Sequence, residues 1–325
     1  MQFNQSPSLA AVLFVSIACL GRAAGETELP PDSLRPRLYA TGFAFAEGPA
    51  LDSSGNLYVV NYREKGTIGR IGTDGTAEIF CDLRELCPVE GREPRGNGLK
   101  IDSEGRLIVA DQGAGRLLRV AADGKQAEVL ADRHEGRRFQ EVNDVCLDLD
   151  GNIYFTDPAG STAEKPNGSI YRYDIKTKST HVLDTGLAYP NGIAVTPDQK
   201  HLCVSETAQF RVLIYELTDE KRTQHRRELI DFQRAARQDY PIGKFMPDGM
   251  IFDAAGRLYV AMWTNGVINV IDVSEGRIIR QYDAGGLNAT NCHFHEGRLY
   301  ITVASKEAVF RLDLNVLGFD YNGKD

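Results

Sequence analysis

A pair of apolar, alternating segments joined by a tight turn occurs six times in this chain of 325 residues. Each copy has a polar residue near its start, and the turn is rich in Asp, Gly and Asn in most of the copies. The alternation is typical of β-strands, and the turn composition is typical of tight hairpins. Each copy therefore predicts two antiparallel strands. The copies occupy residues 45–62, 95–112, 142–158, 189–207, 246–263 and 290–305.

Further strand-like segments follow most of the copies, for example at 66–80, 115–130 and 168–183. The repeat thus contains four strands. The copies start roughly fifty residues apart, a spacing typical of β-propellers with one repeat per blade. We predict an all-β fold, a six-bladed β-propeller with four antiparallel strands per blade.

The last repeat has no fourth strand after residues 308–314. Near the start of the chain, RPRLYATG (35–42) resembles STHVLDTG (179–186), which occupies a fourth-strand position. We therefore predict that an N-terminal strand completes the last blade, which closes the ring and covers a sheet edge.

The interval between the fourth and fifth copies is the longest, and residues 218–245 lengthen it. This segment contains RRELIDFQRAARQD (226–239), the best short helical pattern in the chain. We expect an insertion with a helix between blades 4 and 5, on one face of the disc.

The N-terminal segment has the pattern of a signal peptide. Residues 9–20 form an apolar run too short to span a bilayer as a helix, and small residues follow it. We predict a signal peptide at 1–25, a linker at 26–34 and the propeller at 35–325, in a protein exported to the periplasm or the extracellular space. Lipid attachment at Cys19 is disfavoured because Ser16 is a poor residue for that motif.

The net charge of −8 excludes a basic surface for nucleic acid. No segment beyond the N-terminal one is long and apolar enough to span a membrane.

Cys81 and Cys87 are close enough in sequence to form a disulfide in an oxidising compartment. The strand patterns around Cys146, Cys203 and Cys292 predict buried thiols.

A polar residue recurs at the start of every copy. The first strand of each propeller blade lines the central channel, so we expect these six side chains to converge near one end of it. Burying such a ring is costly unless its oxygens are satisfied, and a divalent cation would satisfy them. Oxygen ligands favour Ca²⁺ or Mg²⁺, with Mn²⁺ or Zn²⁺ able to compete. The ring residues are Glu47, Asn97, Asn143, Asn191, Asp248 and Asn291.

A structural interpretation of the same residues is also open. Asn-Gly and Asp-Gly are common turn dipeptides, so residues 97, 191 and 248 also fit a role in backbone turns. That interpretation does not explain why acids replace Asn in only two of the six copies.

Four motifs make the sequence similar to the senescence-marker-protein/gluconolactonase family of regucalcin-like, six-bladed propeller lactonases. The resemblance covers residues 35–315. It implies one divalent cation, for which Ca²⁺ is the first candidate, and hydrolysis of a small-molecule lactone to the hydroxy acid. The motifs are FAEGP (45–49), Asn-Asp (143–144) with FTDP (155–158), YPNGIAVTPD (189–198) and PDGM (247–250).

The resemblance also implies roles for particular residues. Glu47, Asn191 and Asp248 would bind the metal, and Asn143 would contact metal or substrate. The cation would polarise the lactone carbonyl, and Asp248 is the candidate general base. Asn97 and Asn291 have no strong match to the family and are expected to line the channel.

The substrate is less well defined than the chemistry. Sugar-lactone members of the family often have Arg two residues before the Asn of the Asn-Asp motif, where this chain has Glu141. Substrate-binding candidates are Asn143, Glu141 and His293, while Tyr62 and Trp263 are expected to pack in the core.

Two alternatives remain: a phosphotriesterase-like hydrolase, and a non-catalytic propeller that binds a ligand or partner protein around a structural metal. The oligomeric state is left open.

Overall fold

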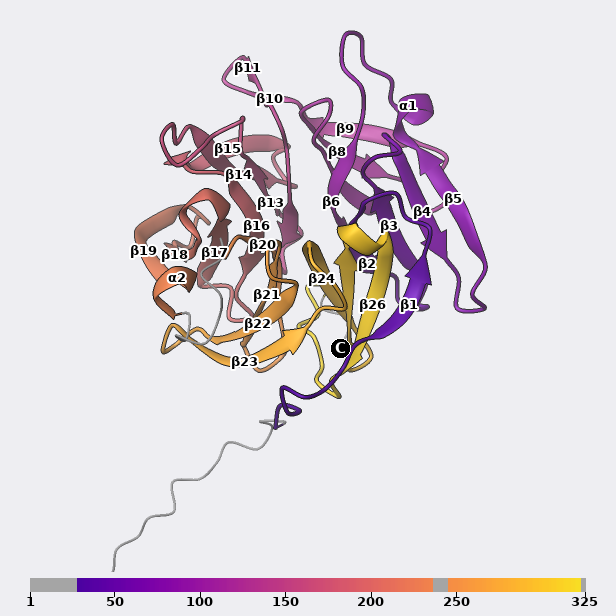
Figure 1. Ribbon diagram of the computed structural model, residues 1–325. Helices are drawn as coiled ribbons and strands as arrows, with labels where there is room; N and C mark the ends of the chain where they lie inside the picture. Colours follow the sequence, from indigo (N-terminus) through magenta and orange to yellow (C-terminus); the bar gives the residue numbers. More distant parts are fainter. Residues whose placement is uncertain (1–27, 236–244, 323–325) are drawn as a thin grey trace, which may run out of the picture.

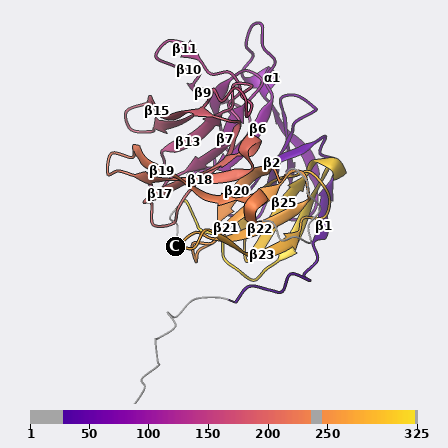
Figure 2. The ribbon, with the colours of Figure 1, turned by 60° about the vertical axis from the view of Figure 1, so that its left-hand side comes forward.

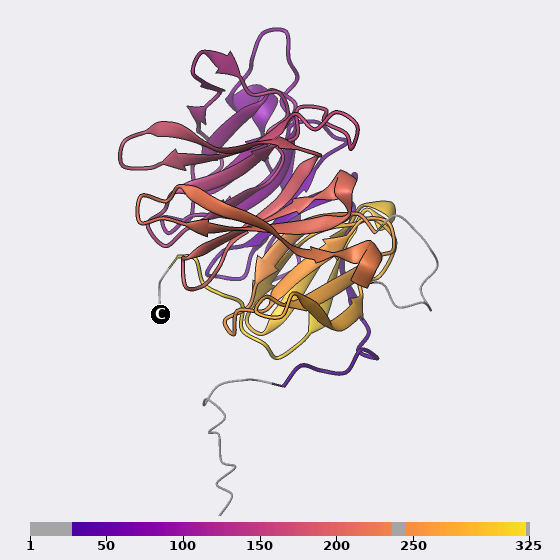
Figure 3. The same ribbon diagram turned by 90° about the vertical axis from the view of Figure 1, so that its left-hand side faces the viewer.

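The computed structural model describes residues 28–235 and 245–322, and it confirms the predicted fold. Six four-stranded antiparallel sheets stand around a central axis as the blades of a propeller (Figure 1). In the turned views, Figure 2 and Figure 3, the sheets of neighbouring blades are seen stacked against one another.

The strands of each blade follow one another in the chain. Blades 1 to 3 consist of β2 (Ala46–Leu51), β3 (Leu57–Asn61), β4 (Thr67–Ile71) and β5 (Ala77–Asp82); β6 (Gly96–Ile101), β7 (Leu107–Asp111), β8 (Arg116–Val120) and β9 (Ala127–Ala131); and β12 (Val145–Leu147), β13 (Ile153–Asp157), β14 (Gly168–Asp174) and β15 (Ser179–Leu187). Blades 4 to 6 consist of β16 (Pro190–Val195), β17 (His201–Glu206), β18 (Arg211–Leu217) and β19 (Thr223–Asp231); β20 (Pro247–Phe252), β21 (Leu258–Met262), β22 (Val267–Asp272) and β23 (Arg277–Asp283); and β24 (Ala289–His295), β25 (Arg298–Val303), β26 (Ala308–Asp313) and β1 (Arg37–Thr41).

The connections contain little regular structure. The short helix α1 (Leu83–Leu86) follows β5, and α2 (Phe232–Ala235) follows β19. A small hairpin of β10 (Arg133–His134) and β11 (Arg137–Arg138) leads into blade 3 and projects from the disc (Figure 1).

The first strands of the blades form a closed ring around the channel. Strand β2 contacts β6 and β24, strand β12 contacts β6 and β16, and strand β20 contacts β16 and β24. Every first strand therefore has the first strands of two other blades as neighbours, which brings side chains from all six repeats to one axis.

The N-terminal strand closes this ring as predicted. Strand β1 pairs antiparallel with β26, with Arg37 opposite Arg311 and Thr41 opposite Ala308. Blade 6 is therefore built from both ends of the propeller sequence, so separating the blades requires breaking this sheet.

The helix predicted for residues 226–239 is largely wrong. Residues up to Asp231 belong to β19, the fourth strand of blade 4, which pairs with β18. Only the single turn α2 is helical, and residues 236–244 lie outside the described residues. The outer edge of β18 needs a partner strand, and this pairing outweighs the local helical pattern.

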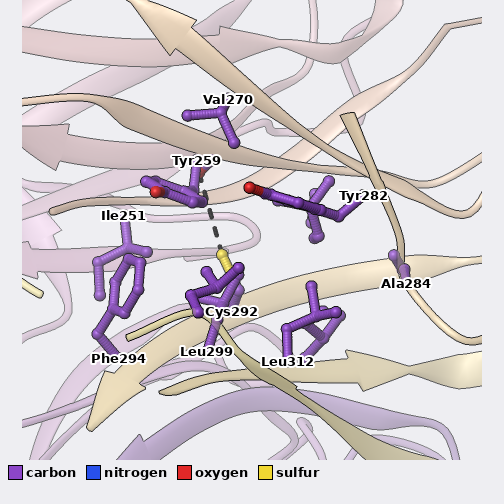
Figure 4. Packing of buried hydrophobic residues seen from close by; sticks show 14 of the residues in the cluster. Ile251, Tyr259, Val270, Tyr282, Ala284, Cys292, Phe294, Leu299 and Leu312 are labelled. Atoms are coloured by element: carbon purple, nitrogen blue, oxygen red, sulfur yellow. Dashed lines mark hydrogen bonds between the residues drawn. The ribbon is translucent and has the colours of Figure 1, made fainter. Parts of the chain in front are cut away.

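The hydrophobic core lies between the blades. Figure 4 shows the contact of blades 5 and 6, where Tyr259 and Ile251 pack against Cys292, Leu299 and Phe294. The predictions of buried thiols are confirmed, since Cys146, Cys203 and Cys292 are buried. The disulfide considered for residues 81 and 87 is absent, because both cysteines are free thiols.

The C-terminal segment crosses one end of the channel, a feature that the sequence did not suggest. Phe319 N–H donates to Phe252 O (3.1 Å), the Tyr321 hydroxyl to Val195 O (2.9 Å), and Asn322 Nδ2 to Ile101 O (3.3 Å). Each acceptor is the last residue of a first strand, in blades 5, 4 and 2. The segment thus ties three blades together.

The predicted signal peptide at 1–25 lies outside the described residues, and export stays a prediction. Within the described ranges, none of the helices combines the length and the apolar character needed to cross a bilayer.

We expect Tyr321 to contribute to stability, because its ring packs against the cores of three interfaces and its hydroxyl bonds Val195 O. Replacing a partly buried aromatic by Ala should lower the free energy of unfolding by about 2–3 kcal/mol, and Tyr321→Phe by about 1 kcal/mol. Urea unfolding measures both changes. Leu317→Ala, at a side chain 67% exposed, is the matched control. Equal stability of Tyr321→Ala and the control would contradict this role.

Candidate functional site

The six ring residues lie buried at the start of the first strands, at the end of the channel opposite the C-terminal segment. We call this end the mouth. Glu47 is 6% exposed, Asp248 8% and Asn143 3%. Burial and then the charge of Asp248 raise the pKa of Glu47, so these two ring side chains lie close together.

Irregular strand pairing shapes the ring. The register of the first hairpin shifts at the ring position, for example between Glu47 and Ala50 in blade 1 and between Pro247 and Met250 in blade 5. Such bulges bend a strand and redirect its side chains.

The glycines after the ring residues allow close packing of adjacent blades. A Cβ on Gly48 would lie 2.3 Å from Asn97 O, and one on Gly192 would lie 2.2 Å from Asp248 O. The dipeptides at 97, 191 and 248 therefore do not form turns. They lie in β6, β16 and β20, so the interpretation as turn dipeptides is wrong.

Buried hydroxyls fix the backbone of the ring across blade boundaries. Thr156 donates to Asn191 O (2.9 Å), and Ser205 donates to Asp248 O (2.8 Å). Thr290 in blade 6 donates to Ala46 O in blade 1 (3.0 Å). These donors hold the ring residues in place, and of the three only Thr156 lies in a motif named from the sequence, FTDP (155–158).

The carboxylates of the ring repel one another. Burial raises the pKa of Glu47 well above its usual range, and the charges of Asp248 and Asp144 raise it further. Burial and the charge of Asp144 likewise raise the pKa of Asp248, while Asn191 and the Gly249 N–H favour its charged form. The charges that act on Glu47 and Asp248 are those of other acids, so two carboxylates from blades 1 and 5 share a buried centre in which they repel each other.

Asp144 is a third acid at this centre, although the sequence analysis named only its neighbour Asn143. Burial raises its pKa to about 6, and the charge of Lys100 opposes that rise. Asn291 Nδ2 donates to Asp144 Oδ2 (3.2 Å). Asn291 thus orients an acid of the channel, and the Asn-Asp motif was the signal that could have identified Asp144.

The ring fits a hard divalent cation by its donor chemistry. Asn143 Oδ1 is buried and has no hydrogen-bond partner in the described residues. The two ring carboxylates would supply negative charge, and carboxamide oxygens would supply further ligands. Among the described residues, no group of three or more His, Cys, Asp or Glu side chains could hold a metal, so any cation here depends on the carboxamides.

The other predicted substrate residues lie in two places. Glu141 is near the mouth: after burial and the charge of Asp248, its charge contributes to the raised pKa of Tyr189. Its Oε2 accepts from Gly160 N–H (2.8 Å). His293 is not at the mouth. It lies further along β24. Together with Lys100 of β6, it lines a cavity of about 430 Å³ next to the C-terminal segment. Burial lowers the pKa of His293 to about 3.

The relatives found by comparison with known proteins include two that match most of the chain. A gluconolactonase of Zymomonas mobilis subsp. mobilis is 26% identical over 294 residues, which cover 86% of this chain and 81% of that protein. A diisopropyl-fluorophosphatase of Loligo vulgaris is 28% identical over 299 residues, which cover 82% and 88% of the two chains.

The fold is shared with a calcium-binding regucalcin of Agrobacterium tumefaciens. The TM-score is 0.70 at 19% identity, over 88% of this chain and 95% of that one. Residues 45–305 match the family model described as SMP-30/Gluconolactonase/LRE-like region. Since that match spans most of the propeller and all six ring positions, this chain is a member of the SMP-30/gluconolactonase/LRE-like family.

Proposed function

We propose that the protein is a divalent-metal-dependent lactonase that opens a lactone or related cyclic ester to the hydroxy acid. The observation that carries the proposal is the buried centre where Glu47 and Asp248 approach each other beside the unpartnered Asn143 Oδ1. Glu47, Asn143, Asn191 and Asp248 would hold the cation. The gluconolactonase relative supports lactone hydrolysis, and the calcium-binding regucalcin supports Ca²⁺.

The chemistry follows from the charges at the centre. A bound cation would polarise the lactone carbonyl and stabilise the oxyanion. Asp248 takes a proton from the water whose oxygen attacks the carbonyl carbon. The ring C–O bond then breaks, and the proton returns to the leaving alkoxide, which gives the hydroxy acid. No Ser or Cys nucleophile is required.

Burial suits Asp248 to the role of base. Burial raises the pKa of Asp248 in the metal-free centre, and a bound cation would oppose that rise. The hydrogen bond from Ser205 to Asp248 O fixes the backbone beneath it. A base held in one orientation, away from bulk water, accepts a proton without a large reorganisation of its surroundings.

A second candidate is hydrolysis of a phosphotriester or fluorophosphate at the same centre. The relative from Loligo vulgaris favours it, because the similarity extends over most of both chains. A cation bound to the same residues would polarise P=O instead of C=O. Parallel assays of lactones and a phosphotriester distinguish the two.

We expect lactone hydrolysis to stop when a chelator removes the cation and to return with added Ca²⁺. Because the cation would bind the folded protein and not the unfolded chain, it should also raise the melting temperature by about 5 °C or more. A pH-indicator assay on a lactone panel and a thermal melt measure the two effects. Turnover that persists in chelator would contradict metal dependence. A metal-dependent melt without turnover of any lactone or phosphotriester would favour the non-catalytic propeller.

We expect Asp248→Asn to lower kcat/KM for lactones about 10²–10⁴-fold, the usual contribution of a general base. Asp123→Asn is the matched control, because Asp123 lies in an exposed turn between β8 and β9. Far-UV circular dichroism should show the same β-rich fold for both variants. An Asp248→Asn protein as active as the control would refute the role of the base.

A further inference from the structure

Three aromatic side chains form a wall beside the mouth. Phe45 and Tyr62 of blade 1 lie with their ring centroids 5.1 Å apart, and Trp263 of blade 5 lies 5.6 Å from Phe45. Blade 6 separates blades 5 and 1, and it carries Ala304 at the position of Tyr62 and Trp263, since Ala304 N–H donates to Asn288 O as Tyr62 N–H donates to Phe45 O. We call Phe45, Tyr62 and Trp263 the aromatic wall.

The aromatic wall belongs to the mouth and is not part of the core. All three residues are partly exposed, which corrects the expectation that Tyr62 and Trp263 pack in the core. Phe45 is two residues from Glu47, and its carbonyl accepts from Tyr62 N–H (3.2 Å). The charge of Glu47 also reaches the Tyr62 phenol, where it adds to the effect of burial and raises the pKa.

The backbone at the aromatic wall is strained. Phe45 has φ of 60°, and Tyr189, the equivalent residue of blade 4, has φ of 58°. This left-handed conformation costs a bulky aromatic residue about 1–2 kcal/mol, and such strain clusters at binding and catalytic sites. Burial and then the charges of Asp248 and Glu141 raise the pKa of Tyr189, so its phenol lies close to these acids.

Arg95 of blade 2 adds a positive charge next to the aromatic wall. Its guanidinium carbon lies 4.5 Å from the centroid of the Tyr62 ring, and Asp111 Oδ1 accepts from its backbone N–H (2.8 Å). Its Nε is buried and lacks a hydrogen-bond partner among the described residues. A buried donor of a charged group is costly when unpaired, so a ligand with an acceptor group would stabilise it.

The mouth offers little to a sugar lactone in comparison. Position 141, where sugar-lactone relatives often carry Arg, holds Glu141, and Gly160 N–H donates to its carboxylate. An aromatic surface instead favours an apolar ring that stacks on it.

We propose that this site takes aryl-substituted lactones, with the aryl group against the aromatic wall and a carboxylate on that group paired with Arg95. This inference rests on the proposed function, since it assigns a substrate class to the same centre. Phe45 and Trp263 would hold the aryl ring by stacking. Arg95, already aligned on Tyr62, would bind the carboxylate at the ring's far side.

Trp263 is the only tryptophan of the chain, so its fluorescence reports on the aromatic wall directly. The probes are two lactams, which resist hydrolysis: a phenyl γ-lactam and its 4-carboxyphenyl analogue. Both should change the fluorescence saturably. Arg95→Leu should weaken binding of the carboxyphenyl lactam about tenfold or more and that of the phenyl lactam by less than about threefold.

Two further variants complete the binding experiment. Arg95→Lys should recover part of the affinity for the carboxyphenyl lactam, and Arg277→Leu, at an exposed arginine of the outer strand β23, should leave both affinities unchanged. No saturable change in fluorescence, or an equal loss of both affinities in Arg95→Leu, would overturn the inference.

Turnover tests the inference separately from the proposed function. The kcat/KM for a phenyl γ-lactone should exceed that for gluconolactone about tenfold or more, and Phe45→Ala should remove most of this preference. Hydrolysis of gluconolactone at least as fast as of the phenyl lactone would overturn the substrate class and leave lactonase activity standing. Saturable lactam binding without hydrolysis of any lactone would uphold the ligand class and refute the proposed reaction.

Discussion

The repulsion between two buried carboxylates is the constraint on which the site depends. Glu47 and Asp248 come from blades 1 and 5, and each loses solvation at the mouth while facing the other's charge. The scaffold opposes this cost by packing the first strands into a closed ring and by fixing their backbone through Ser205 and Thr290. A bound divalent cation would remove this repulsion, and its charge would also activate a carbonyl.

Much of the fold and of the ring could be predicted because both depend on local pattern. Each hairpin carries its own alternation and turn, so six copies define six blades without knowledge of their contacts. Every ring residue except Asn291 stands at the same distance from its hairpin turn, and the closed arrangement of β2, β6, β12, β16, β20 and β24 brings the starts of these strands to one mouth. The closing strand β1 was recognisable by its likeness to another fourth strand.

What could not be predicted depends on contacts between distant segments. Residues 226–231 have a helical pattern, yet they form part of β19 because β18 presents an unpaired edge. The glycines of the Asn-Gly and Asp-Gly dipeptides resemble turn residues, yet Gly192 is small because Asp248 O of the next blade lies against it. His293 shares a strand with a ring residue, but its position further along the channel places it in a different cavity.

The aromatic wall is a further feature that could not be predicted, because it depends on contacts between distant segments. Phe45 and Trp263 are far apart in sequence, and only the closed propeller brings their ring centroids to 5.6 Å. In the function proposed here, the ring residues would define the reaction, and the surrounding residues of blades 1, 2 and 5 would define which substituent the lactone carries. The most direct test of the central claim is a crystal structure of the protein with Mn²⁺ in place of Ca²⁺, located by anomalous scattering. We predict a single ion at the mouth with Glu47 and Asp248 among its oxygen ligands, at about 2.0–2.6 Å. An ion bound only elsewhere, with both carboxylates turned away from a common centre, would contradict the account.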